Sequence, residues 1–291
     1  MDSDDFRYLP SPEHLNFTCV LAGVEPVRLD REFTCLELAC DQQPTLAEAV
    51  ARNPNARFYV AEVDARIAAG AAALPPMDFI ILRGAYSWLD RKERHHYVEL
   101  CKHYLKPGGV AYVSYNALPG CSSVLPLQRL VREQGKLRGD GPAQQLAHAA
   151  LLAGQLRSAG AAYFEDNDTH AMRCQLNAIA QGGTAAPHPM HEFMRPGWEA
   201  LHHADVARAM SEAKLDYVAS ADMSVSDPDR GLTPAQRALI EAQAMPALRE
   251  TVRDILLDTA FRRDVYVRGA RRMHPLRREE LLGASRFRLS A

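Results

Sequence analysis

The sequence predicts an α/β fold of the doubly wound, Rossmann-like kind, built on a mostly parallel sheet. Between residues 33 and 116, short apolar segments alternate with amphipathic ones. This alternation of strand and helix is typical of parallel sheets. Lys106-Pro107-Gly108-Gly109 is a strong helix-to-strand turn, because Pro and Gly end helices. The 291 residues allow one large domain or two modest ones, each with a buried core.

Four strands are expected in the first half of the chain, each a short run rich in apolar and β-branched residues. They are FTCLELAC (33–40), RFYVAEVD (57–64), MDFIILRGAYSWL (77–89, running into a loop) and GVAYVSYN (109–116). The connections predict helices: one beginning near Pro44, a short one in the alanine-rich ARIAAGAAALPP and an amphipathic one over 91–105. A cap helix between proline-bounded turns is expected before the first strand.

The second half predicts mainly helices. Residues 124–181 show helical patterns, and 182–189 form a linker. We expect two further strands, HEFMRP and LDYVASADMS (215–224), with a helix over 199–213 between them. From Thr233 to about Tyr266 we expect helix, with a kink or break at Pro246. The predicted units are a cap (1–30), a Rossmann core (31–120), a helical insert (121–187), the end of the sheet (188–224) and a carboxy-terminal helical segment (225–291).

Composition excludes several classes of protein. Apolar residues make up 47% and charged residues 24%, which is the ordinary globular mixture. The net charge of −2 gives no general reason to expect nucleic acid or an anionic membrane as partner. Six scattered cysteines form no CxxC pair, and the acidic start lacks the layout of a signal peptide. We therefore expect reduced thiols and a cytoplasmic protein without a membrane span.

Several segments resemble the class I S-adenosylmethionine-dependent methyltransferases. They are similar to the subgroup with a methyltransferase regulatory domain, which includes bacterial protein lysine methyltransferases. Gly84–Trp88 (GAYSW) and Ala111–Gly120 (AYVSYNALPG) carry the most specific part of this resemblance. The amino-terminal SPEHLNFTCVLAGVEPV is similar to the subgroup's lead-in. The stretch from HEFMRP to DMS and the later VRDILLDTAFRRDV look like its regulatory segment, so that the resemblance covers roughly residues 8–270. The resemblance implies a methyltransferase sheet, S-adenosylmethionine as cofactor and a protein partner or an oligomer.

The resemblance also implies which residues face the cofactor and the methyl acceptor, since ligands of such sheets bind beyond the carboxyl ends of the strands. The positions matching the cofactor site are Glu37, Ala39, Asp41, Glu62, Asp64, Arg83 and Gly84. Those matching the acceptor site are Tyr86, Tyr115 and Asn116. Glu62 and Asp64 end the second strand, where an acid commonly binds the ribose. A surface turn explains these acids about as well, and a packed loop explains Tyr86 to Trp88.

Two departures from the family pattern affect the cofactor site. After the first strand the family has a glycine-rich loop, LELGCGxGGNL, whereas this chain reads LELACDQQPTL. Glycine serves in such loops because the backbone must approach the ligand closely. Only 13 residues separate Asp64 from Asp78, which is enough for one short crossover but not for a helix, a strand and their connections. We therefore expect a sheet shortened by about one strand and an adenine pocket that lacks a wall.

These departures favour a non-catalytic reading, in which a methyltransferase-like protein has lost normal cofactor binding. Such a protein would act as a partner or regulatory subunit, for example of a homologous methyltransferase. The alternative is an active methyltransferase acting on a protein, peptide or small-molecule nucleophile. A metal site is not expected at His188, His191 and Glu192, because prolines flank His188 and the resemblance accounts for the segment. Loss of a strand leaves an open sheet edge, and pairing with another chain is one remedy.

Overall fold

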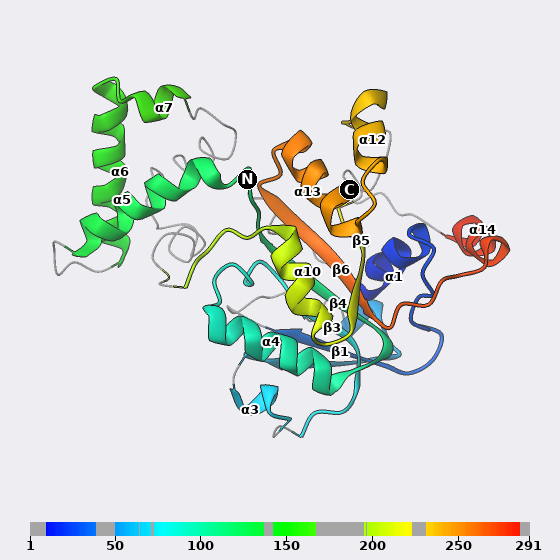
Figure 1. Ribbon diagram of the computed structural model, residues 1–291. Helices are drawn as coiled ribbons and strands as arrows, with labels where there is room; N and C mark the ends of the chain where they lie inside the picture. The colour runs from blue at the N-terminus through cyan, green and yellow to red at the C-terminus, as the bar shows by residue number, and fades with distance from the viewer. Residues whose placement is uncertain are drawn as a thin grey trace.

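The computed structural model describes residues 10–38, 50–63, 65–70, 73–136, 142–166, 195, 197–222 and 231–285. In this part of the chain a six-stranded sheet has the order β2-β1-β3-β4-β6-β5 (Figure 1). The strands are β1 (Phe33–Leu38), β2 (Ala56–Ala61), β3 (Met77–Leu82), β4 (Leu105–Asn116), β5 (Leu215–Ser220) and β6 (Phe261–Arg268). The first four are parallel, and β6 runs antiparallel to both β4 and β5. The doubly wound fold predicted from the sequence is confirmed.

The shortening of the sheet is also seen in the described residues. Between β2 and β3 they contain only the one-turn helix α3 (Ala65–Ala68). Strand β2 is therefore an edge strand, with β1 on one side and no described strand on the other. The physical reason is the one expected from chain length, since 13 residues hold a short crossover and nothing more.

Helices cover both faces of the sheet. On one face α4 (Arg91–Tyr104) and α10 (His203–Ser211) bury a large core that includes Leu36, Ile80 and Tyr97. On the other face α1 (Pro12–Leu21) packs Leu15 and Cys19 against the sheet. Helix α4 begins with a capping box, in which Asp90 and Glu93 each accept a hydrogen bond from the other's backbone amide, so its start is fixed by sequence.

The expectation of helix up to Tyr266 was wrong for its last part. Helices α12 (Pro234–Glu241) and α13 (Pro246–Leu257) are present, and the expected break falls where Pro246 begins α13. Phe261–Arg268, however, is the strand β6, inserted between β4 and β5 (Figure 1). The run Val265-Tyr266-Val267 is typical of a strand. Burial on both faces removes the polar–apolar alternation that would have made it evident.

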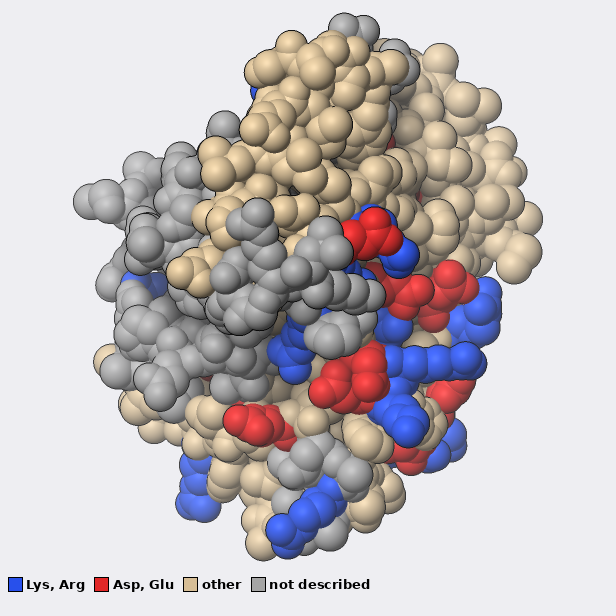
Figure 2. Space-filling model, turned by 90° about the vertical axis from the view of Figure 1, so that its left-hand side faces the viewer, with Lys and Arg blue, Asp and Glu red and all other residues tan. Residues whose placement is uncertain are grey.

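The helical insert packs mainly on itself. Its described helices are α5 (Leu125–Lys136), α6 (Pro142–Ser158) and α7 (Ala162–Asp166), with the short 3-10 helix η1 (Ser122–Val124) before them. They share a small core of Leu127, Val131, Ala149 and Phe164 and project away from the sheet in Figure 1. Arg157 is the one charged residue of α6. In Figure 2 the upper part of the surface accordingly shows few charged side chains.

Arginines in and just before the last described helix contact helix α1. Helix α14 (Pro275–Ala284) packs beside α1. The Arg278 guanidinium donates hydrogen bonds to the carbonyls of Val20 and Leu21, and Arg272 donates to the carbonyl of Ala22. Cations at the carboxyl end of a helix stabilise its unsatisfied carbonyls. These arginines therefore hold α1 in place.

Candidate functional site

The candidate site lies at one edge of the sheet, where the parallel strands β1, β2, β3 and β4 end. Glu37 lies next to the end of β1, Glu62 directly follows β2, Arg83 and Gly84 follow β3, and Asn116 ends β4. Sheets of this kind bind ligands beyond these strand ends. Of the other expected cofactor positions, Ala39, Asp41 and Asp64 lie outside the described residues.

The side chains of Glu37 and Arg83 contact each other. The neighbouring strands β1 and β3 bring them together, and the Arg83 guanidinium forms an ion pair with the Glu37 carboxylate. The two side chains are only 18% and 13% exposed. Burial lowers the pKa of Arg83, but an arginine remains charged at neutral pH. Two residues expected to face the cofactor thus neutralise one another at the carboxyl ends of β1 and β3.

Gly84 forms the turn after β3. Its φ of 63° lies in the left-handed region, which glycine adopts without steric cost. Its amide donates a hydrogen bond of 2.7 Å to the Ser114 hydroxyl on β4. This bond ties the ends of the two strands together. Glu62, in contrast, is exposed.

Tyr86, Ser87 and Trp88 form a buried turn. The Tyr86 ring packs edge-on against Tyr97 with centroids 5.7 Å apart, and against Tyr115 at 6.2 Å. Burial raises the pKa of Tyr86 far above its usual value, so the hydroxyl stays protonated. The Ser87 hydroxyl accepts a hydrogen bond of 2.8 Å from the Asn116 amide. These contacts agree with a packed loop that closes this part of the core.

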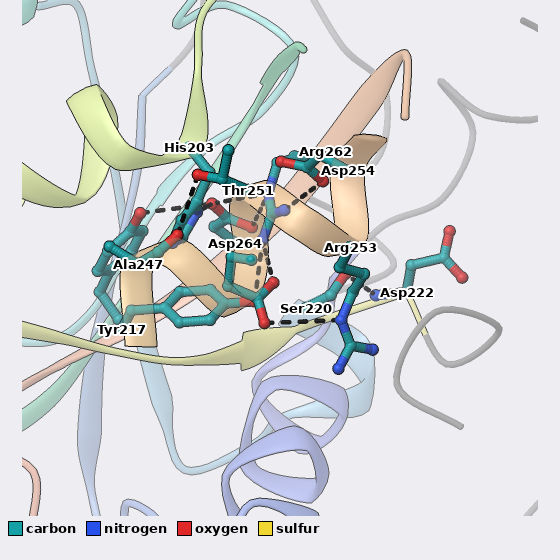
Figure 3. Close-up of polar contacts among 12 residues, drawn as sticks. His203, Tyr217, Ser220, Asp222, Ala247, Thr251, Arg253, Asp254, Arg262 and Asp264 are labelled. Atoms are coloured by element: carbon teal, nitrogen blue, oxygen red, sulfur yellow. Dashed lines mark hydrogen bonds and ion pairs between the residues drawn. The ribbon is translucent and has the colours of Figure 1, made fainter. Parts of the chain in front are cut away.

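A buried polar network joins the end of β4 to β6 (Figure 3). The Tyr115 hydroxyl donates to Asp264 at 2.7 Å, and Nδ1 of His203 lies 2.9 Å from the same carboxylate. Arg262 contacts three carboxylates: Asp264 at 3.0 Å, Asp254 at 2.6 Å and Glu250 at 2.8 Å. Tyr217 on β5 completes the group, its hydroxyl accepting from Arg262 at 3.0 Å.

The charges of this network are compensated, as buried charges must be. Burial alone would raise the pKa of Asp264, but the Arg262 charge and the hydrogen bonds from His203 and Tyr115 outweigh it and lower the pKa to about 2. Burial, partly offset by Arg262, raises the pKa of Asp254. Asp264 is therefore the ionised centre to which several elements are bonded.

Sequence reasoning missed this network. His203 lies in the helix expected over 199–213, but nothing in the sequence predicted that its side chain is buried against Asp264. Arg262 and Asp264 were assigned to a helix, although β6 directs their side chains to the same face of the sheet as Tyr115. A signal was present, since the β-branched and aromatic run at 265–267 indicates a strand. The described residues contain no cluster of three or more His, Cys, Asp or Glu side chains fit for a metal ion.

Comparison with known proteins finds a family model that matches the segment containing most of this network. Residues 190–268 match the model described as a predicted methyltransferase regulatory domain. This range holds His203, Tyr217, Asp254, Arg262 and Asp264, so the network lies within the matched segment except for Tyr115. The match covers 79 of the 291 residues and shows that this segment is similar to a methyltransferase regulatory domain.

Similar proteins and solved structures match most of this chain. An uncharacterised protein of Synechocystis, sll1526, is 29% identical over 303 residues, covering 96% of this chain and 59% of its own length. The structure of PKMT2 from Rickettsia typhi is similar with a TM-score of 0.71 at 16% identity, over 94% of this chain and 56% of that one. PKMT2 in complex with AdoHcy gives 0.69 at 17% identity, over 89% and 54%. The chain thus spans between half and three-fifths of the length of these proteins. No helix in the described ranges is long and apolar enough to cross a membrane.

Proposed function

We propose that this chain is a methyltransferase-like scaffold that has lost normal S-adenosylmethionine binding and acts as a non-catalytic partner or regulatory subunit, for example of a homologous methyltransferase. The observation that carries the proposal is the ion pair between Glu37 and Arg83. An acid at the end of β1 that is neutralised within the protein is not available to a ligand. Separating the pair to admit one would leave charges buried without partners.

Two further features support the loss of the cofactor. The loop after β1 reads Asp41-Gln42-Gln43 where the family has glycines, and side chains there hinder the close backbone approach that such ligands require. Strand β2 lies at the edge of the described sheet, so no described strand follows on its outer side. By the resemblance, the loop of that further strand would hold the adenine. Both features count against binding of the cofactor in the way that the family binds it.

The expected acceptor residues support the same conclusion. Tyr86 and Tyr115 are buried, and the Tyr115 hydroxyl is bonded to Asp264 rather than presented to a substrate. Asn116 is buried, and its backbone amide and carbonyl are bonded to Ser87 and Leu201. These residues serve to join the sheet to its regulatory segment, which is the role expected of a scaffold.

The alternative function is that of an active methyltransferase with unusual cofactor binding. It is favoured by the AdoHcy complex of the similar PKMT2 and by Glu62, an exposed acid directly after β2 where a ribose contact is expected. In that case Tyr86, Tyr115 or Asn116 would position the acceptor. Catalysis would depend on proximity and on desolvation of the nucleophile, because no strong general base is evident among the described site residues.

Calorimetry and thermal-shift measurements with S-adenosylmethionine and AdoHcy distinguish the two functions. The scaffold predicts neither heat nor a shift at millimolar ligand. Dissociation constants of about 10–100 μM or tighter, equivalent to about 5–7 kcal/mol, would refute it. If binding is seen, E62Q should abolish it only if the ligand lies beyond the ends of the parallel strands, next to Glu62. E241Q, at an exposed position of α12, is the matched control.

Restoring the glycines tests which departure matters more. The double variant D41G/Q43G should still fail to bind either ligand, because the missing strand remains missing. A clear gain in affinity would show that the loop alone had abolished binding.

The partner role is tested by adding the chain to a longer, active relative and measuring the rate of methyl transfer. An unchanged rate at saturating chain would argue against a regulatory subunit.

A further inference from the structure

A cavity of about 200 Å³ lies along β5, the edge strand at the other end of the described sheet from β2. Residues of helices α1 and α13 form its other walls, so three elements distant in sequence meet there. The pairing of β5 with β6 shifts register between Tyr217 and Ala219, which leaves Val218 as a bulge in the cavity wall. Bulges occur preferentially at sheet edges and next to active sites. The cavity is therefore examined for the chemistry of its lining.

One oxygen of the Glu250 carboxylate is available in this cavity. Its Oε2 accepts hydrogen bonds from the Tyr217 hydroxyl at 3.2 Å and from Arg262 at 2.8 Å. Its Oε1 accepts no hydrogen bond from any residue that the structure describes, and lies 3.7 Å from Nε of Arg253. Because the two bonds to Oε2 hold the carboxylate in place, Oε1 has a fixed position. An ionised carboxylate oxygen only accepts hydrogen bonds, so it suits an N–H group of a ligand.

Arg253 adds a positive charge to the same wall. It lies three residues after Glu250 on α13, and its side chain is 23% exposed. Figure 3 shows the terminal nitrogens of Arg253 directed away from Arg262 and Asp264. A guanidinium has five N–H donors and binds carboxylates through two of them at once. The cavity thus presents a hydrogen-bond acceptor and a cationic donor side by side.

The size and charge of the cavity define the kind of ligand. A volume of about 200 Å³ equals that of roughly seven waters, which is far too small for a nucleotide and matches a free amino acid. A wall with one acid and one base favours a ligand with both charges, because a singly charged ligand would be repelled by one of the two side chains. Aliphatic side chains supply much of the remaining lining: Leu21, Ala22, Val218 and Ala219.

We propose that this cavity binds a free α-amino acid with a small apolar side chain, whose ammonium group donates to Oε1 of Glu250 and whose carboxylate accepts from Arg253. The apolar side chain of the ligand lies against Leu21 and Val218. The inference goes beyond the proposed function and does not depend on it, because the cavity lies along β5 and not at the ends of β1 to β4. Glu250 also bonds Arg262, so the ligand contacts the network that joins the regulatory segment to the sheet.

Calorimetry of the full chain with L-valine, L-leucine, L-isoleucine and L-methionine tests the proposal. At least one of them should bind with a dissociation constant of about 1 mM or tighter. The amide of that amino acid lacks the carboxylate, and the corresponding deaminated acid lacks the ammonium group. Each analogue should bind at least about tenfold more weakly. No heat from any of the four at about 10 mM, or an analogue that binds as tightly as the amino acid, would overturn the proposal.

Variants of α13 test the two charged contacts. R253Q and E250Q should each weaken binding at least about tenfold. R249Q, at an exposed position of the same helix where Nε bonds the Gln243 carbonyl, is the matched control and should bind within about twofold of wild type. Thermal melts check folding, and R253Q decides the matter if E250Q fails to fold without its charge beside Arg262. Unchanged affinity in R253Q, or an equal loss in R249Q, would contradict the site.

Discussion

The buried carboxylate of Asp264 provides the sharpest test of how the regulatory segment is fixed to the sheet. D264N keeps the shape of the side chain and removes its charge. His203 and Tyr115 would face a neutral amide, and Arg262 would keep only Asp254 and Glu250. Removing one partner of a buried pair costs about 3–5 kcal/mol. Because two carboxylates still face Arg262, we expect a loss of about 3 kcal/mol of unfolding free energy at pH 7.

The pH dependence follows from the same carboxylate. Its pKa falls from 3.8 to about 2 on folding, so the unfolded chain binds the proton more readily between these values. The stability that Asp264 contributes is then fully present above about pH 4 and is lost as the pH falls through 2. One pKa unit corresponds to 1.36 kcal/mol, which gives about 2 kcal/mol in total, of which about half is lost by pH 3. The raised pKa of Asp254 acts in the opposite direction, so the effect is read from the difference between wild type and variant.

The assay is urea unfolding followed by tryptophan fluorescence from Trp88 and Trp198. The difference in unfolding free energy between wild type and D264N should be about 3 kcal/mol at pH 7 and about 1 kcal/mol smaller at pH 3. D205N, which removes a carboxylate from an exposed pair with Arg208, should change stability by less than about 0.5 kcal/mol. A D264N cost below about 1 kcal/mol, or a difference independent of pH, would refute the reasoning.

Two further substitutions test the ion pair between Glu37 and Arg83 and the close backbone approach at Gly120. E37Q should destabilise the chain by about 1–3 kcal/mol, because it leaves the Arg83 charge largely buried without its partner. The double variant E37Q/R83M should recover most of the loss. Additive losses of unfolding free energy in urea would contradict a coupled pair. G120A should cost about 1–3 kcal/mol, because its Cβ would lie 2.3 Å from the Asp258 carbonyl oxygen, while G154A on α6, with no atom within 4 Å, should be neutral or stabilising; equal melting temperatures for the two would show that the backbone yields at Gly120.

The sequence by itself determined the parallel half of the sheet. Strands β1 to β4 and helix α4 follow from local patterns: apolar runs, a capping box at Asp90 and the helix-ending Pro107 to Gly109, which the structure includes in the first part of β4. The loss of a strand also follows from the sequence, because chain length between Asp64 and Asp78 is a local quantity. Glu37, Glu62 and Arg83 were placed at the strand ends for the same reason.

Only the tertiary structure decided which of these residues meet. The ion pair between Glu37 and Arg83 depends on β1 lying beside β3, and the bond between Tyr115 and Asp264 joins residues 149 positions apart. No local pattern encodes contacts at such separations. Strand β6 was missed because a central strand is buried on both faces and carries charges that only its partners compensate. Burial and partner choice are properties of the folded chain, and here they decide that the polar residues of the regulatory segment hold the sheet together.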